Sequence, residues 1–356
     1  MNGEPYRMNL DFYRGKRVFI TGHTGFKGAW LSKLLLASGA CVTGYALEPP
    51  TDPALFTLLG LSGEMESIIG DVRDYEHLHA AMKSAKPEIV LHLAAQPIVR
   101  TSYEEPRYTF ETNVMGTVNM LESVRMTDTV RSVVNVTTDK VYLNVEREEG
   151  YTEDEPLDGY DPYSNSKSCS DLVTHSYVNS FFAAPGGPAV STARAGNVIG
   201  GGDFARDRIL PDCVRAVSQG RPIIIRNPNS VRPFQHVLEP LAAYLLIAEK
   251  QYEDKSLAGA YNVGPDKGDT ASAGEIADYF VNAWGEGASW ITQGDGGPHE
   301  AGLLALNSGK IQRNLGWQPR WNIREAVEKT VEWSKVYVAG GDVRKITDSE
   351  IREYFG

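Results

Sequence analysis

The first half of the chain alternates short apolar runs with amphipathic stretches. Runs rich in β-branched residues predict buried strands at 17–22, 41–47, 88–95 and 132–139. Apolar residues at helical spacing predict helices at 27–39, 74–85, 112–126 and 162–182. Strands that alternate with helices in this way are typical of a parallel sheet covered on both faces. The expected fold class is therefore α/β, a doubly wound Rossmann-type sheet.

The alternation of apolar runs and amphipathic stretches becomes less regular in the second half of the chain. A strand beginning at Ala189 runs into the glycine-rich "GNVIGGGD", and short elements separated by "RNPNSVRP" and "VGPDKGD" follow. No Gly/Ser or Pro linker divides the chain. We expect a Rossmann domain over residues 1–190, to which some later segments return, and a smaller, irregular α/β lobe over 191–356. The ligand should lie in the cleft between them.

Composition excludes several classes of protein. A formal net charge of −11, with no cluster of Lys and Arg, argues against nucleic-acid binding. The three cysteines form no Cys-x-x-Cys pair, so we expect neither a disulfide framework nor a zinc site, and the reducing cytoplasm is favoured. No segment reaches the ~18 apolar residues of a membrane span, and the first residues lack a signal-peptide run. We expect a soluble, unanchored protein without a metal.

The segment "VFITGHTGFKG" places Gly22, Gly25 and Gly28 between a predicted strand and a predicted helix. Glycines at this spacing let the chain turn sharply, let a pyrophosphate approach the backbone and let helix pack on strand. An isolated match is also typical of an ordinary strand-to-helix turn. The flanking elements favour a dinucleotide site here.

The residues after the second strand bear on which dinucleotide binds. An acidic residue usually holds the adenosine ribose about 20 residues after the glycines, but Ala46 and Leu47 stand there and Glu48 lies just beyond. No arginine is present to attract a 2′-phosphate, which favours NAD over NADP. Asp71, after the third strand, is either an adenine contact or the amino-terminal cap of the helix that follows.

Tyr163 and Lys167 are four residues apart in a predicted helix, so their side chains project from one face. A phenol has a free pKa of about 10 and is a poor base near neutrality. A neighbouring ammonium favours the phenolate, so Tyr163 could remove a proton from a substrate hydroxyl. The alternative is an exposed Tyr and Lys on a polar helix. The preceding dinucleotide motif favours the catalytic interpretation.

At this point a family resemblance emerges. The motifs "TGHTGFKG", "HLAAQP", "NVMGT", "TTDK", "PYSNSK" and "RAGNVIGGGD" resemble the extended short-chain dehydrogenase/reductase family. With "RPFQHVLEPL" and "LGWQPRW" they are similar to its CDP-glucose branch of sugar 4,6-dehydratases. The similarity runs from about Gly15 to about Trp321 and so covers most of the chain.

The resemblance implies a reaction in which NAD oxidises C4 of CDP-glucose, water leaves across C5 and C6, and the hydride returns to C6. Asp139 then fits the general acid that protonates the leaving hydroxide. Many dehydratases place a Glu base next to this Asp, whereas Lys140 stands here, as it does in the CDP-glucose branch. Lys140 is either the C5 base or an electrostatic partner of the intermediate. Thr138 is either a hydrogen-bond donor to the C4 oxygen or a plain strand residue.

The resemblance also implies two sets of ligand contacts. For the cofactor these are Gly22, Thr24, Gly25, Phe26, Lys27, Gly28, Asp71, Val72, Leu93, Ala94, Ala95, Asn113, Tyr163, Lys167 and Arg194. For the nucleotide sugar they are Gln96, Tyr103, Asn197, Arg208, Arg226, Arg232 and Asn262. Guanidinium groups suit a diphosphate because they donate two parallel hydrogen bonds. For Gln96 and Tyr103, packing within a loop is an equal alternative.

Two segments depart from the family pattern. "NVEREEGYTE" at 144–153 lacks the tryptophans of relatives, and "HEAGLLALNSGK" at 299–310 lacks an expected aromatic and an expected polar residue. Both departures affect the expected identity of the nucleotide base more than they affect the expected reaction. A 4-epimerase would share Tyr163 and Lys167 but has no need of an Asp-Lys pair, and a silent dinucleotide sensor has no need of all these groups. A homodimer or homotetramer is expected from the resemblance.

Overall fold

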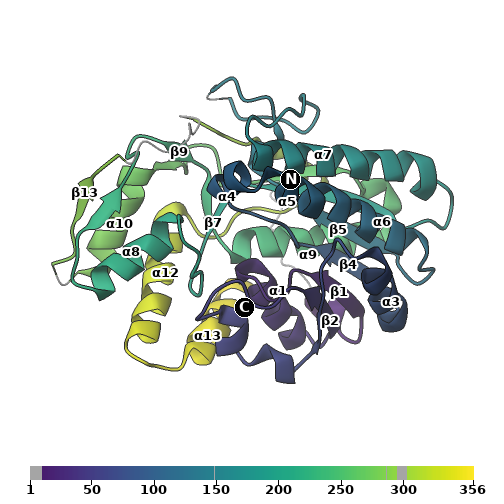
Figure 1. The fold of residues 1–356 in the computed structure, drawn as a ribbon, viewed down its shortest axis with the longest axis horizontal. Helices are drawn as coiled ribbons and strands as arrows, with labels where there is room; N and C mark the ends of the chain where they lie inside the picture. Colours follow the sequence, from purple (N-terminus) through teal and green to yellow (C-terminus); the bar gives the residue numbers. More distant parts are fainter. Residues whose placement is uncertain (1–9, 148, 286, 295–302) are drawn as a thin grey trace.

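The computed structural model describes residues 10–147, 149–285, 287–294 and 303–356. Its centre is a sheet of seven parallel strands in the order β11-β6-β5-β4-β1-β2-β3 (Figure 1). The strands are β1 (Arg17–Thr21), β2 (Cys41–Ala46), β3 (Glu66–Ile69), β4 (Ile89–His92), β5 (Ser132–Val136), β6 (Ala189–Ala195) and β11 (Ala260–Val263). All the strands predicted for the first half are confirmed.

Helices cover both faces of the sheet because side chains of successive strand residues point to opposite sides. Val18 and Ile20 belong to one buried cluster, and Phe19 between them belongs to another. The first cluster packs under α1 (Phe26–Ala37), α9 (Leu238–Glu253), α11 (Gly309–Leu315) and α13 (Val343–Phe355). The second packs under α3 (Tyr75–Ala85), α6 (Gly116–Arg125) and α7 (Pro162–Tyr177). The doubly wound α/β class is thus confirmed.

Short helical segments complete this part of the chain. They are η1 (Leu10–Tyr13), α2 (Leu55–Leu58), η2 (Leu61–Gly63), α4 (Val99–Glu104), α5 (Pro106–Phe110), η3 (Glu111–Met115), η4 (Asp139–Val141), η5 (Val178–Phe182) and η6 (Lys255–Leu257). Two predicted helices are therefore composite. The segment at 112–126 begins as the π-helix η3 before α6, and the segment at 162–182 ends in the π-helix η5 after α7.

A smaller lobe stands beside the sheet, at the left of Figure 1. Its strands are β7 (Asn197–Ile199), β8 (Ile223–Ile225), β9 (Val231–Arg232), β10 (Phe234–His236), β12 (Ala271–Ser272) and β13 (Trp290–Thr292). They form the pairs β7 with β10, β8 with β13 and β9 with β12. The helices are α8 (Ile209–Ser218), α10 (Ala273–Trp284) and α12 (Ile323–Val338). A separate apolar cluster that includes Ile223, Phe280 and Val327 holds the lobe together.

The two parts are interwoven along the chain. Residue 190 lies inside β6, and β6 and β11 are neighbouring strands of the large sheet. The helices α9, α11 and α13 also return to that sheet from the second half of the chain. The chain therefore passes between the sheet and the lobe several times. No described helix is long and apolar enough to cross a membrane.

Candidate active site

The glycine-rich turn joins β1 to α1 under tight steric limits. Gly22 has φ +81, and a Cβ there would lie 2.8 Å from the backbone N of Ala94. A Cβ on Gly28 would lie 2.0 Å from the carbonyl oxygen of Gly22. Gly25 is the amino-terminal cap of α1, where no side chain bonds the first backbone N–H groups. The turn therefore presents uncapped N–H groups next to the end of β4, an arrangement suited to a phosphate.

Two side chains of this turn make contacts within the protein. Thr24 Oγ1 donates to the carbonyl of Leu47 at 2.8 Å and so ties the turn to the end of β2. Phe26 packs against the sheet's apolar cluster.

His92, interpreted from sequence as a residue at the edge of the core, is buried beside Thr21, and burial lowers the pKa of its imidazole to about 3.

Asp71 does not cap the helix that follows it. The amino-terminal cap of α3 is Asp74, whose carboxylate accepts from the backbone N of His77 at 3.1 Å. The capping alternative for Asp71 is therefore wrong. Asp71 instead pairs with Arg73 at 2.6 Å. Burial would raise the pKa of Asp71, but the bonds from Arg73 hold it below its usual value.

The helix α7 brings Tyr163 and Lys167 into the site. It begins where sequence indicates, because Asp161 caps it by accepting from Ser164 N and Pro162 occupies its first turn. Burial raises the pKa of Tyr163 to about 12, while a hydrogen bond with Thr138 and the charge of Arg208 oppose that rise. Lys167 donates from Nζ to the carbonyl of Val136 at 3.0 Å, and burial lowers its pKa to about 8.

The acid triplet follows directly after β5. Thr138 Oγ1 donates to Asp139 Oδ1 at 2.9 Å, and Lys140 Nζ donates to the same oxygen at 3.1 Å. Lys140 Nζ also donates to Asn197 Oδ1 at 3.1 Å. Asp139 is fully buried, and its Oδ2 has no hydrogen-bond partner in the part of the chain that the structure describes. One carboxyl oxygen is thus held by the protein, and the other is buried and accepts no hydrogen bond from the described residues.

A further lysine lies in this centre, and the sequence alone did not place it there. Lys27 interacts electrostatically with Arg208, Lys167, Asp139 and Lys140. Burial, with these neighbouring cations, lowers the pKa of Lys27 to about 7. The family resemblance had implied a cofactor contact for Lys27 and no other role, because the charged residues that act on it are distant in sequence.

Arg194 and Asn262, both predicted as ligand contacts, are buried and make hydrogen bonds within the protein. Arg194 pairs with Asp171 at 2.9 Å and donates from NH1 to Tyr142 Oη at 2.9 Å. Tyr142 in turn donates to Asn262 Oδ1 at 2.6 Å, and Asn262 Nδ2 donates to the carbonyl of Tyr151. Asn262 is fully buried. The hydrogen bonds of both side chains therefore hold α7 and the loop after β5 in place.

Asp171 is a member of this network that the sequence reasoning missed. Its carboxylate accepts from Thr137 and Thr192 as well as from Arg194. A signal was present, because Asp171 follows Lys167 by the same four-residue step that separates Lys167 from Tyr163. That spacing places all three on one face of α7.

The loop after β4 contains some residues that are partly exposed and others that make hydrogen bonds within the protein. Leu93, Ala94 and Ala95 are partly exposed at the end of β4. Gln96 is buried, donates to Thr109 Oγ1 and accepts from Ile98 N, so the loop-packing alternative describes it. Asn113 accepts from Gln96 N and donates to Ser166 Oγ, which fastens this loop to α7. Val72 packs in the sheet's second apolar cluster.

The remaining substrate candidates lie on loops and on β9 of the lobe and on α4. Arg208 pairs with Asp203 at 3.4 Å, and Arg226 pairs with Asp207 at 2.7 Å. Arg232 is buried and donates to its neighbour's carbonyl, that of Val231. Tyr103 is 43% exposed, and burial together with Asp161 and Tyr160 raises the pKa of its phenol.

The two segments that depart from the family pattern lie side by side. Tyr151 N donates to the carbonyl of Ala305 at 3.0 Å, and Asn307 N donates back to the carbonyl of Tyr151 at 2.9 Å. Tyr151 also stacks on Tyr142. Glu148 and the residues 299–302 lie outside the described part of the chain.

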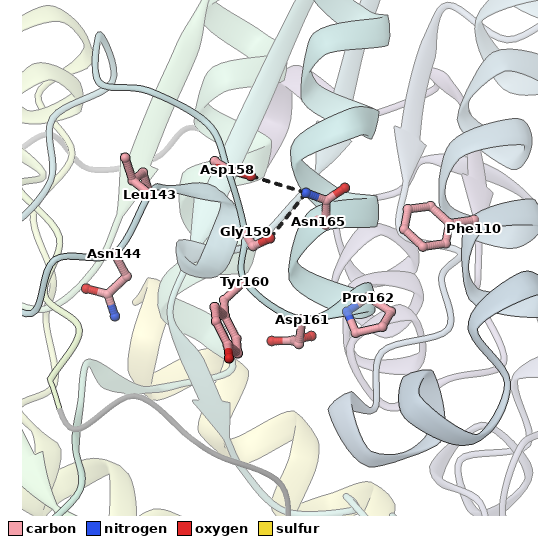
Figure 2. Close-up of a pocket in the computed structure, with 9 residues that line it drawn as sticks. All are labelled: Phe110, Leu143, Asn144, Asp158, Gly159, Tyr160, Asp161, Pro162 and Asn165. Atoms are coloured by element: carbon pink, nitrogen blue, oxygen red, sulfur yellow. Dashed lines mark hydrogen bonds between the residues drawn. The ribbon is translucent and has the colours of Figure 1, made fainter.

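Figure 2 shows a pocket of about 420 Å³ near the start of α7. It is lined by Phe110, Leu143, Asn144, Asp158, Gly159, Tyr160, Asp161, Pro162 and Asn165. None of the catalytic candidates lines it, although Pro162 immediately precedes Tyr163. Among the described residues, no three His, Cys, Asp or Glu side chains gather so that they could hold a metal ion.

Comparison with known proteins gives consistent matches. Residues 19–330 match the family described as GDP-mannose 4,6 dehydratase. The CDP-glucose 4,6-dehydratase of Salmonella typhimurium is 48% identical over 352 residues, which cover 98% of this chain and 98% of that protein. The Thermus thermophilus UDP-glucose 4-epimerase, in complex with NAD, superposes with a TM-score of 0.78 at 26% identity, covering 90% of this chain and 99% of that one. DesIV, a dTDP-glucose 4,6-dehydratase from Streptomyces venezuelae, gives a TM-score of 0.77 at 24% identity, covering 92% and 99%.

Proposed function

The chain belongs to the GDP-mannose 4,6 dehydratase family, and from this premise we propose that it is a CDP-glucose 4,6-dehydratase. It converts CDP-glucose to CDP-4-dehydro-6-deoxyglucose and water with NAD as its cofactor. The observation that carries the proposal is the buried carboxyl of Asp139, whose charge acts on the phenol of Tyr163. A 4-epimerase needs the Tyr and Lys but has no use for a buried acid beside them.

The residues at the glycine turn fit NAD. Gly22 and Gly28 let the backbone of the turn pack closely where a Cβ would collide with it, the first N–H groups of α1 are uncapped, and Leu93 to Ala95 are partly exposed beside them. Bound there, NAD would supply the hydride acceptor for oxidation at C4 of the sugar and the hydride donor for reduction at C6. The chain itself supplies the proton transfers, and we assign Lys167, which follows Tyr163 by four residues on α7, to act on both the cofactor and Tyr163.

Tyr163 removes the proton from the C4 hydroxyl. Burial raises its pKa to about 12, so the phenol is protonated in the empty site at neutral pH. The hydrogen bond with Thr138 and the positive charge of Arg208 lower that pKa and so favour the phenolate. Thr138 is therefore placed to position the phenol and the C4 oxygen together.

Asp139 protonates the hydroxide that leaves C6. Its Oδ1 already accepts from Thr138 and Lys140, so the proton belongs on Oδ2, which has no partner among the described side chains. Lys140 donates two hydrogen bonds, to Asp139 and to Asn197. An ammonium bonded in this way favours an electrostatic role on the enolate-like intermediate over the role of C5 base.

The diphosphate of the substrate contacts Arg208, Arg226 and Arg232. These guanidinium groups come from the lobe, and two of them pair with the nearby carboxylates Asp203 and Asp207. A diphosphate offers the paired oxygens that a guanidinium fork binds best. We assign Asn262 no contact with the diphosphate, because its side chain makes hydrogen bonds within the protein.

We expect a homodimer or a homotetramer, and exposed apolar side chains support such an association. Large apolar side chains stand exposed on η3, α7 and η5, namely Met115, Leu172 and Phe181, each about half exposed. Apolar surface of this kind on adjacent helices favours association. The mass of the protein in solution, by light scattering, tests the dimer, and Leu172→Glu is expected to shift it toward the monomer.

The test of the activity is incubation of the purified protein with NAD and, in parallel, CDP-, dTDP-, GDP- and UDP-glucose. We expect the alkaline absorbance of a 4-keto-6-deoxy sugar, and loss of one water by mass, from CDP-glucose alone. Conversion without a mass change would make the protein an epimerase. No turnover of any of the four sugars would reject the dehydratase proposal.

A further inference from the structure

The proposed reaction leaves one proton on Tyr163 that the next turnover needs on Asp139. Tyr163 takes the proton of the C4 hydroxyl, and Asp139 gives a proton to the hydroxide that leaves C6. The hydride that leaves C4 returns to C6, and the base that removes the C5 proton returns a proton to C5. At the end of each turnover Tyr163 therefore carries one proton too many, and Asp139 carries one too few.

Bulk water has little access to these two groups, and a single hydroxyl joins them. Tyr163 is 9% exposed, Thr138 is 5% exposed and Asp139 is 0% exposed. Thr138 Oγ1 donates to Oδ1 of Asp139 at 2.9 Å, and it also forms a hydrogen bond with the phenol of Tyr163. The side chain of Thr138 therefore connects the base on α7 to the acid that follows β5.

The remaining contact of Thr138 gives this connection a direction. A threonine hydroxyl has one hydrogen to donate and two lone pairs that accept. Its hydrogen goes to Asp139, and the backbone N–H of Lys140 donates to Oγ1 at 3.5 Å. One lone pair is then left for the phenol, so Tyr163 is the donor in its bond with Thr138. The three groups form a chain of hydrogen bonds that runs from the phenol to the carboxyl group.

We propose that the hydroxyl of Thr138 passes a proton from Tyr163 to Asp139 in each turnover and so resets both groups, an inference that rests on the proposed function. The O–H bond of Tyr163 breaks as its proton binds Oγ1 of Thr138. The original O–H bond of Thr138 breaks as that proton binds Oδ1 of Asp139. The phenol becomes a phenolate, the carboxylate becomes a carboxylic acid and the threonine hydroxyl is restored. The transfer exchanges no proton with solvent and needs no oxidant or reductant.

Two features of the site affect this transfer. Burial raises the pKa of the Tyr163 phenol, whereas the bond with Thr138 and the charge of Arg208 oppose that rise and favour release of the proton. The proton arrives on Oδ1 of Asp139, and Oδ2 is the oxygen without a partner among the described residues. A half-turn of the carboxyl group about its Cβ–Cγ bond exchanges the two oxygens before the acid acts again.

The experiment compares the first turnover with later ones by rapid chemical quench of the full-length protein with NAD and CDP-glucose. Thr138→Val removes the hydroxyl and keeps the β-branched shape. A molecule that starts with Asp139 protonated completes one cycle and then waits for a proton from solvent. We therefore expect a burst of up to about one product per site, followed by a phase about 10²-fold slower. The wild type should show no burst.

Three further variants complete the comparison. Thr138→Ser keeps a hydroxyl and should behave as the wild type. Thr138→Ala is a second protein without the hydroxyl, should Thr138→Val be unstable, and thermal unfolding shows which variants are folded. The matched control is Thr129→Val, which removes a hydrogen bond to the carbonyl of Pro87 at the other end of β5 and should show no burst.

Slow release of product also gives a burst, so the slow phase is measured again in D₂O and at rising concentrations of imidazole buffer. A phase limited by proton transfer becomes slower in D₂O and faster with the buffer, because imidazole donates and accepts protons near neutral pH. We expect both effects in Thr138→Val. A slow phase that responds to neither would overturn the relay.

The outcomes separate this inference from the proposed function. If the wild type dehydrates CDP-glucose and the variants without the hydroxyl slow the first and later turnovers equally, Thr138 only positions the C4 oxygen. Asp139 is then reprotonated by another route, and Lys140, which donates to it and is 25% exposed, is the nearest one. If the wild type forms no dehydrated product, both proposals fail.

Discussion

The ammonium of Lys140 lies 3.1 Å from Oδ1 of Asp139, and Oδ2 of the same carboxyl has no partner among the described residues. The two oxygens of this buried group are therefore unequal. One is held by a cation and by Thr138, and the other accepts no hydrogen bond from the described residues. This asymmetry is what an acid needs in order to deliver its proton in one direction.

Asp139→Asn should block the elimination and spare the oxidation. An amide keeps the shape of the side chain but cannot donate the proton to the leaving hydroxide, so water loss should fall by about 10²- to 10⁴-fold. In a single turnover, NADH absorbance should appear while the 4-keto-6-deoxy product does not. Asp154→Asn, at an exposed carboxylate of the neighbouring loop, is the control. Equal loss of both half-reactions would refute the role of Asp139.

Variants of Lys140 distinguish charge from base catalysis. Arginine keeps the positive charge and does not accept a proton at working pH, so Lys140→Arg should retain water loss to within about tenfold of the wild type. Lys140→Met should lose about 100-fold, since it also releases Asp139 and Asn197. The rates of product formation measure both effects. If arginine is as damaging as methionine, Lys140 is the C5 base.

Arg194 should prove to be structural. Its pairing with Asp171 is buried, and Arg194→Met leaves that carboxylate without its partner, so the free energy of unfolding should fall by about 3–5 kcal/mol. The matched control is Arg125→Met, which removes the surface pair with Glu122 and should cost about 1 kcal/mol or less. Denaturant unfolding measures both. Unchanged stability together with weakened NAD binding would restore Arg194 to the cofactor site.

Asp207 should compete with the substrate for Arg226. Its carboxylate lies 2.7 Å from Arg226 and 3.9 Å from Arg100, and its φ of +60 is unusual for a residue other than glycine. A diphosphate must displace it, so Asp207→Asn should tighten the binding of CDP by a few-fold, in line with the small worth of an exposed ion pair. Arg226→Met should weaken it. Calorimetry with CDP gives both values, with Asp348→Asn on α13, which removes the pair with Lys33, as the control. Weaker binding by Asp207→Asn would show that the carboxylate orients the arginine instead.

Glu239 should make stability depend on pH. Burial raises its pKa to about 7, although Tyr354 and the backbone N of Trp321 donate to it. A carboxyl whose pKa is raised on folding stabilises the folded state most below its unfolded pKa, near 4.3, and loses that contribution as pH rises to 7. The loss is on the order of 1.4 kcal/mol per pKa unit.

The measurement is the melting temperature between pH 4.5 and 8 for the wild type and for Glu239→Gln. The decline of the wild type with rising pH should be steeper than that of the variant. Burial also raises the pKa of Glu350, with the same sign, so only the difference between the two proteins reports on Glu239. Parallel curves would mean that Glu239 stays ionised across this range.

Local sequence determined the sheet and the parts of the site that lie on single elements. The β-branched runs gave the strands because such residues suit a pleated, buried surface. The glycine spacing gave the turn, since Gly22 and Gly28 sit where a Cβ would collide with backbone. Tyr163 and Lys167 were paired correctly because the pitch of a helix alone brings them to one face.

Only the tertiary structure decided which charged groups face one another. Arg194 and Asn262 looked like ligand contacts, yet they are bonded to Asp171 and to Tyr142, which distant segments bring to them. Lys27 looked like part of the glycine turn alone, yet the fold sets it beside Asp139. Sequence spacing constrains residues within one helix or turn, whereas a buried charge takes its partner from whatever element packs against it, and that packing is fixed only by the whole chain.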